Sequence, residues 1–213
     1  MSRDFEFKQL LRAYRNGIIN EATFEKEMAG LEGDSNGASP NGGFRAMGKS
    51  YPSERAAIMA FLENSAVGEA GGAEAFSKWA EVCKTECIRS GLHMLAEREA
   101  YHSRQLTRRL NALGGECHGT MREDVRKFIS FVANPNRSDV DKLAQIYKNG
   151  DPAAIFKPAR EFIASIKEDM ETREMLRLFI EDEASTLTWL ADSSKALSCA
   201  AEPMAATAPA ATA

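Results

Sequence analysis

Polar side chains interrupt the apolar faces of two long predicted helices, and this conflict constrains the fold more than any other feature of the sequence. Between residues 85 and 113, apolar residues recur every three or four positions, which is typical of a buried helix face. Glu99 and His102 fall in the middle of that face, and Glu69 interrupts the face of the preceding segment. Because an unpaired buried carboxylate is strongly destabilising, these groups need a neutralising partner, and a metal ion is the simplest one.

The last predicted helix, residues 169–197, repeats the pattern. Its apolar face contains Leu176, Phe179 and Leu190, and Glu183 lies among them. Three predicted helices therefore each carry an acidic residue within an apolar face. Because helices bury such faces against one another, we expect these acids to converge in the interior.

Nearly all of the chain from residue 53 to residue 197 has the pattern of helices. The predicted helices span residues 53–84, 85–113, 120–132, 138–150, 151–168 and 169–197. Residues suited to capping stand at the start of five of them, namely Ser53, Thr120, Ser138, Asp151 and Asp169. No segment shows the sustained alternation of a strand. The sequence therefore predicts an all-α protein, built as an antiparallel four-helix bundle.

Outside this region the sequence predicts three accessory parts. Residues 1–31 have the pattern of a two-helix hairpin, with Asn20 as the N-cap of its second helix. Residues 32–52 are rich in Gly, Ser, Asn and Pro and predict a flexible linker. Residues 198–213 are too simple in composition to form a core, which predicts a disordered tail. A hairpin this short should dock on the bundle or on a second copy of itself.

The hairpin also carries a resemblance. The segment Leu10-Leu-Arg-Ala-Tyr-Arg-Asn-Gly-Ile-Ile-Asn-Glu-Ala-Thr-Phe-Glu, in which a Gly-Ile turn joins two amphipathic helices, resembles the short two-helix modules of the SHOCT type. Those modules are associated with oligomerisation. The resemblance therefore implies a homo-oligomer assembled through residues 1–31.

Composition excludes several classes of partner. A net charge of -4 and a pI near 5.6 give no reason to expect nucleic-acid binding. The first residues include acids where a signal peptide needs an apolar core, and no apolar run reaches the roughly 18 residues that cross a bilayer. We therefore expect a cytoplasmic protein that binds no membrane. The 4 cysteines form no Cys-x-x-Cys pair, which argues against a zinc or rubredoxin-type site and favours reduced packing residues.

The acidic residues carry a second resemblance. Val67-Gly-Glu-Ala-Gly-Gly-Ala-Glu-Ala-Phe, followed by Glu99-Ala-Tyr-His102, resembles the first half of the ferritin-like and rubrerythrin-like di-iron proteins, and Phe179-Ile-Glu-Asp-Glu-Ala-Ser-Thr-Leu-Thr-Trp-Leu resembles their last helix. In that family a Glu on each of two helices and a Glu-x-x-His on each of the others point inward. The resemblance implies that Glu69 is the first-helix carboxylate and His102 a nitrogen ligand. It implies bridging roles for Glu99 and Glu183.

Two positions depart from the family pattern. Thr186 stands where the last helix should carry a histidine, so a second metal ion would lose a nitrogen ligand. The third-helix carboxylate is open between Glu161, beside an apolar stripe, and Asp151, which also suits a helix cap. The sequence therefore leaves open a site with one metal ion, with two, or with none.

The ligand types suggest the metal and the chemistry. Carboxylates with one or two imidazoles suit iron, or manganese, better than zinc. The leading interpretation is an oxidoreductase whose carboxylate-bridged iron site reacts with oxygen or peroxide. Without a Cys-x-x-Cys iron domain, its electrons would come from a separate donor protein. The alternative is a non-catalytic interaction protein, in which the acids pair with one another or with a buried cation.

The remaining polar motifs are expected at the surface. The charged runs Glu97-Arg-Glu and Arg104 to Arg109 are interpreted as solvated helix face. His93 is interpreted as a surface or boundary residue. His118 has only Cys117 at ligand spacing, and no role follows for it.

Overall fold

The structure, a computed structural model, describes residues 43–147 and 152–201, together with residues 10–14, 19, 20, 23, 24 and 27. The elements of the two long stretches are β1 (Phe44–Ala46), β2 (Lys49–Tyr51), α3 (Glu54–Val82), α4 (Glu86–Ala112), α5 (Glu123–Val132), α6 (Asp139–Tyr147), α7 (Pro152–Ser165) and α8 (Met170–Ala201). This content confirms the all-α class. Within the part of the chain that the structure describes, no helix is both long enough and apolar enough to cross a membrane.

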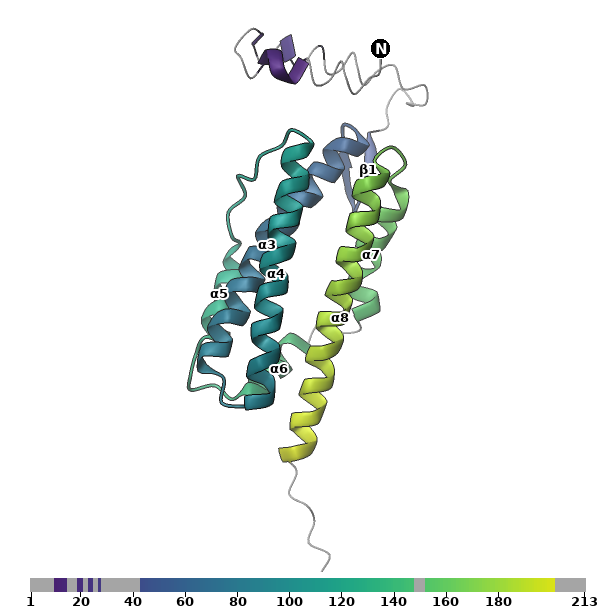
Figure 1. Ribbon diagram of the computed structural model, residues 1–213. Helices are drawn as coiled ribbons and strands as arrows, with labels where there is room; N and C mark the ends of the chain where they lie inside the picture. The colour runs from purple at the N-terminus through teal and green to yellow at the C-terminus, as the bar shows by residue number, and fades with distance from the viewer. Residues whose placement is uncertain are drawn as a thin grey trace, which may run out of the picture.

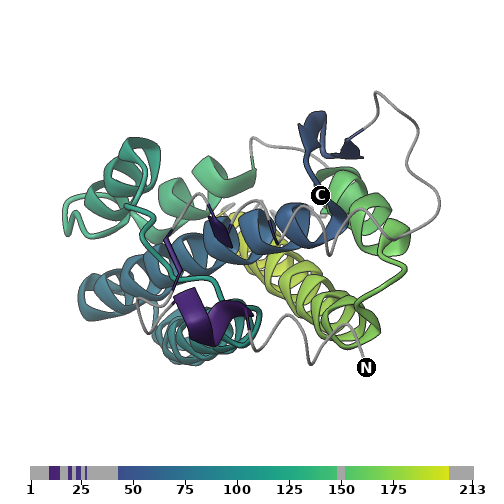
Figure 2. The same ribbon diagram turned by 90° about the horizontal axis from the view of Figure 1, so that it is seen from above.

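The longest helices, α3, α4 and α8, have 29, 27 and 32 residues and run along the molecule (Figure 1). A short turn joins α3 to α4, and the two helices pack antiparallel along most of their length. α8 runs in the same direction as α3, and α7 packs against its first half. The chain after α4 returns along the molecule, so that α5 packs on the face of α3 turned away from α4 (Figure 2). The third rod of the predicted bundle is therefore divided among α5, α6 and α7.

Side-chain caps begin three helices where they were predicted. Ser53 Oγ and Ser138 Oγ each accept a hydrogen bond from the backbone N–H three residues later, both at 3.1 Å. Asp169 Oδ1 does the same at 3.0 Å. The capping box predicted at Thr120 is wrong, because α5 begins only at Glu123 and has no side-chain cap. Local capping chemistry therefore sets the start of α3, α6 and α8.

A β-hairpin precedes α3 within the range predicted as a flexible linker. β1 and β2 pair antiparallel with Phe44 opposite Tyr51, around a turn in which Gly48 has a φ of 76°. The ring of Phe44 meets that of Phe162 edge-on, with centroids 6.3 Å apart. For residues 43–52, the predictions of a linker and of a strand-free chain were therefore wrong. Strands of three residues are too short to show an alternating pattern, and docking on the core stabilises them.

The two ends of the chain are described only in part. Asn20 Oδ1 accepts a hydrogen bond from the backbone N–H three residues later at 2.9 Å, which confirms the predicted N-cap. Tyr14 stacks on Phe24 with ring centroids 4.6 Å apart. α8 continues to Ala201, so the first part of the predicted tail is helical. The rest of the hairpin, linker and tail lies outside the described residues, and the expected self-association stays a prediction.

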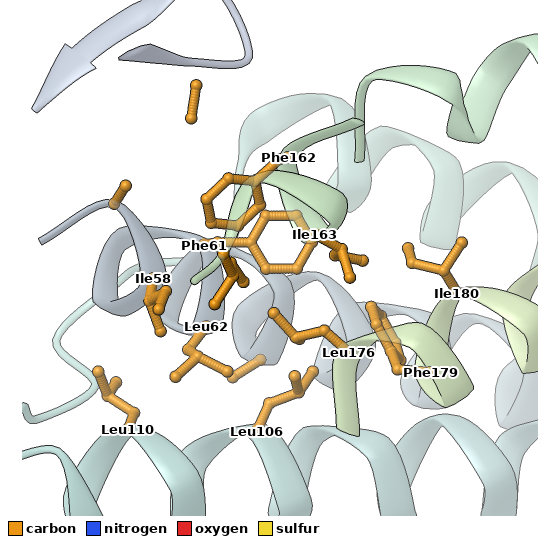
Figure 3. Close-up of a cluster of buried hydrophobic side chains, with 14 residues drawn as sticks. Ile58, Phe61, Leu62, Leu106, Leu110, Phe162, Ile163, Leu176, Phe179 and Ile180 are labelled. Carbon is orange, nitrogen blue, oxygen red and sulfur yellow. The ribbon is translucent and has the colours of Figure 1, made fainter. Parts of the chain in front are cut away.

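Two clusters of buried apolar side chains fill the interior. The cluster nearer the β-hairpin draws on α3, α4, α7 and α8 (Figure 3), and its members include Ile58, Leu62, Leu106, Phe162, Leu176 and Phe179. The other lies toward the α3–α4 turn, and its members include Phe76, Trp79, Leu92, Leu95, Val132 and Leu190. Between them, midway along α3 and α4, Glu69, Glu99 and His102 are buried. Apolar layers on both sides thus enclose a polar layer.

Candidate metal centre

Four of the predicted ligands meet in this polar layer. α3 contributes Glu69, α4 contributes Glu99 and His102, and α8 contributes Glu183. Ligand atoms of Glu69, His102 and Glu183 all lie within 4.8 Å of one another. Glu69, Glu99 and His102 are only 8%, 4% and 5% exposed. The structure therefore brings together the residues that interrupt the apolar faces, from three helices far apart in sequence.

Both ring nitrogens of His102 face carboxylates. Nδ1 lies 3.1 Å from Glu183 Oε1 and 3.5 Å from Glu69 Oε2. Nε2 lies 3.3 Å from Asp182 Oδ2. The Phe179 ring meets the imidazole edge-on, with centroids 5.1 Å apart. The ring is thus held with Nδ1 toward the acids, while Asp182 orients it through Nε2, as carboxylates commonly do for metal-binding histidines.

Glu99 borders the three-residue cluster. The carboxyl group of Glu69 lies beside that of Glu99, and a hydrogen bond between the two, which requires a proton on one of them, contributes to raising the pKa of Glu99. Gly72 on α3 makes room for this approach, because a Cβ there would lie 2.7 Å from Glu99 Oε2. The missing side chain at position 72 therefore lets the Glu99 carboxyl reach α3.

The pKa values of three groups in the polar layer are raised. Burial, reinforced by the charges of Glu69 and Glu183, raises the pKa of Glu99 to about 10. Burial also raises the pKa of Glu183, although its hydrogen bond with His102 opposes the shift. Burial alone would lower the pKa of His102, but the hydrogen bond to Glu183 and the proximity of Glu69 outweigh it and raise that pKa to about 10. At neutral pH, Glu99 and His102 thus each hold a proton that a metal ion would displace.

Two carboxyl oxygens of the site are buried without a hydrogen-bond partner, Glu69 Oε2 and Glu99 Oε1. The N–H at His102 Nδ1 donates to the nearer oxygen, Glu183 Oε1, so Glu69 Oε2 receives no hydrogen bond from it. Buried oxygens without partners are rare in folded proteins and costly to leave unsatisfied. A cation bound among Glu69, His102 and Glu183 would supply a partner to Glu69 Oε2, so the residues present fit a metal ion.

The position expected to carry the second histidine has a different partner. Thr186 is buried at 3% exposure, and its Oγ1 accepts a hydrogen bond from Arg98 Nη2. Arg98 therefore reaches from α4 across to α8, and its assignment to a solvated face was wrong. The same correction applies to Arg109, which donates a 2.7 Å hydrogen bond to Oδ1 of Asp169, the N-cap of α8. A long side chain on the flank of an apolar face can place its charge over the neighbouring helix.

The candidates for the fourth carboxylate do not complete the site. Glu161 lies on the outer face of α7, where its side chain is 67% exposed and 3.9 Å from Lys157 Nζ, so its prediction as a ligand was wrong. Asp151 lies outside the described residues. His93 is exposed, as expected, and His118 lies on the surface 3.3 Å from Glu116 Oε2.

Sequence reasoning missed two members of the site, Arg98 and Asp182. Asp182 is half-exposed and precedes Glu183 by one residue, so its position beside His102 depended on the rotation of α8. Position 98 lies four residues before His102, on the flank of the same face. That spacing was the signal that could have placed Arg98 near the cluster.

Comparisons with protein-family models, with curated proteins and with solved structures found no match for this chain. The case for a function therefore depends on the geometry of the site and on the ligand pattern.

Proposed function

We propose that this protein is a ferritin-like metalloprotein whose helical interior binds a divalent metal ion, iron or in its place manganese. Glu69, Glu99, His102 and Glu183 would hold the ion. One observation carries the proposal: an oriented imidazole and carboxylates from three helices converge in a buried layer in which two carboxyl oxygens have no hydrogen-bond partner among the described residues.

The donor set favours iron or manganese. Three carboxylates and one imidazole offer mostly hard oxygen ligands, and the cluster contains no thiolate of the kind that favours zinc or copper. Cys83, the one buried cysteine among the described residues, lies near the α3–α4 turn instead. The nitrogen ligand would be Nδ1 of His102, which faces Glu69 and Glu183.

The proposed activity is oxidoreductase chemistry with oxygen or peroxide, because bound iron can supply one-electron steps to both. The chain's own residues prepare the site for it. The apolar clusters on either side exclude water, and the Phe179 ring covers one edge of the imidazole. Asp182 fixes the ring by accepting from Nε2. We propose that a separate protein supplies the electrons.

The second candidate is a metal-free helical scaffold, and Arg98 is the observation that favours it. A guanidinium beside the cluster neutralises part of the acidic charge without any metal. In that case the protons on Glu99 and His102 balance the rest, and the protein acts through its surfaces.

Metal analysis separates the two candidates. Protein purified from iron-supplemented cells, and apoprotein reconstituted without oxygen, should each contain close to one ion per chain. The variants Glu99→Ala and His102→Ala should lose it. Glu161→Ala is the matched control, because it removes a glutamate from the exposed face of α7 and should load normally.

A low metal content in wild-type protein would overturn the proposal. If wild-type protein holds far less than one ion per chain under both conditions, the scaffold is correct. Circular dichroism of each variant checks that lost loading does not reflect lost helix.

A further inference from the structure

We infer that Arg98 takes the place of a second metal ion, so that the site binds a single divalent ion. This inference rests on the proposed metal site and adds its stoichiometry. The ferritin-like pattern would have a histidine at position 186, whose imidazole would bind a second metal ion. Here Thr186 stands at that position and is bonded instead by the Arg98 guanidinium.

The position of Arg98 makes it part of the site. Its side chain crosses from α4 to the buried Thr186 hydroxyl, and its Nε atom is buried without a hydrogen-bond partner. Thr186 Oγ1 in turn donates to the backbone oxygen of Asp182 at 3.3 Å. The guanidinium is therefore held among the residues that flank Glu183 on α8.

The charge of Arg98 acts on the cluster through space, since no ion pair among the described residues includes it. Burial dominates the pKa of both Glu99 and Glu183, yet the positive charge of Arg98 favours their ionised forms. A guanidinium stays charged at every physiological pH, so it is a permanent cation at this place. Such interactions are stronger in a buried layer than in water.

Charge balance then points to one ion. Metal ligands must be deprotonated, so Glu69, Glu99 and Glu183 would carry three negative charges and His102 none. One divalent ion together with Arg98 neutralises those three inner charges, while the carboxylate of Asp182, at the outer edge of the site with its side chain 56% exposed, is solvated by water. A second divalent ion would leave an excess of two positive charges in the buried layer, which is strongly unfavourable.

A cycle of variants tests this stoichiometry. Wild type, Arg98→Met, Thr186→His and the double variant are titrated with Fe²⁺ without oxygen, and bound metal is counted by elemental analysis. We expect one ion per chain in wild type and in both single variants, and two in the double variant, which gains a ligand and loses the competing cation. Arg104→Met, on the exposed face of the same helix, is the control and should keep one. Two ions in wild type, or one in the double variant, overturns the inference.

A second measurement needs no metal. Unfolding by urea in the presence of a chelator should show a lower midpoint for Arg98→Met than for wild type. Adding Glu183→Gln to Arg98→Met should restore much of that loss, because the uncompensated negative charge is then removed. If Glu183→Gln changes the urea midpoint equally in wild type and in Arg98→Met, Arg98 is not a counter-ion. If wild-type protein binds no metal, the proposed function is refuted instead. The dependence of the Glu183→Gln effect on Arg98 in the urea experiment then decides by itself whether Arg98 is a counter-ion.

Discussion

Two regions of this molecule bury carboxyl groups, and they treat them in opposite ways. At the α3–α4 turn, Asp139 accepts hydrogen bonds from Trp79 Nε1 at 2.9 Å, from the backbone N–H groups of Lys84 and Thr85 at 3.1 and 3.0 Å, and from Thr85 Oγ1 at 2.7 Å. In the polar layer, Glu69 Oε2 and Glu99 Oε1 have no hydrogen-bond partner among the described residues.

The electrostatic result follows from the number of donors. Burial alone would raise the pKa of Asp139, but the bonds from Trp79 and Thr85 outweigh it and hold that pKa below its ordinary value. Glu99 Oε1 has no donor among the described residues, and burial raises the pKa of Glu99 to about 10. A carboxylate that is fully bonded ties helices together, whereas one left without donors is prepared for a cation.

An amine from α6 is buried beside this turn. Lys142 is fully buried, its Nζ lies 5.9 Å from the centre of the Trp79 ring, and burial lowers its pKa despite the nearby Asp139. The chain therefore builds an amine into the region that holds α6 against the α3–α4 turn.

Removing the bonded acid should have the largest effect on stability. Asp139→Ala leaves the Trp79 indole and the Lys84 and Thr85 amides buried without an acceptor, so we expect a loss of about 3–4 kcal/mol in the free energy of unfolding. Urea denaturation measures it. Asp192→Ala, an exposed acid on α8, should change the free energy by at most about 1 kcal/mol. A small effect at Asp139 would erase the contrast between the regions.

The opposite sign is expected in the polar layer. A folded pKa raised to about 10 means that Glu99 costs stability above its unfolded pKa, and increasingly so as the pH rises toward 10. Glu99→Gln imitates the protonated form. In a chelator at pH 7 it should raise the free energy of unfolding by about 2–3 kcal/mol while abolishing metal loading. A destabilised Glu99→Gln protein would show that the ionised carboxylate is itself part of the folded structure.

The contribution of Asp139 to the free energy of unfolding should depend on pH in the acid range. Because its folded pKa lies below the ordinary 3.8, its stabilising charge is fully present above that pH and is lost as the pH falls through the folded value. The difference in unfolding free energy between wild type and Asp139→Asn should therefore be constant at neutral pH and shrink below 3.8. Urea titrations at several pH values provide the test, and a difference that persists at low pH would contradict it.

The smallest effects are expected from substitutions at two glycines on α3, Gly68 and Gly72. Gly68 has open space around it, so Gly68→Ala should stabilise the helix by up to about 1 kcal/mol. Gly72→Ala places a methyl group 2.7 Å from Glu99 Oε2, so we expect weaker metal binding and no such gain. Comparing the urea midpoints and metal affinities of the two variants isolates the space reserved for Glu99. Identical behaviour of the pair would mean that the carboxyl simply moves aside.

Sequence reasoning placed much of the candidate site and failed where the fold departs from regular rods. Glu69, Glu99, His102 and Glu183 were identifiable because each interrupts an apolar face. Glu161 was not excluded, because the expected long third helix is divided into shorter ones, and α7 buries Phe162 and turns Glu161 outward.

The sequence by itself determined where α3, α6 and α8 begin and which faces of the long helices turn inward. Both depend on neighbours within a few residues, through caps and through the helical period. Only the tertiary structure decided that Arg98 bonds Thr186, that Asp139 closes the α3–α4 turn and that Asp182 supports His102. Those contacts join residues 54 to 88 positions apart, and they depend on how far each helix is rotated and separated from its neighbour, which no local pattern records.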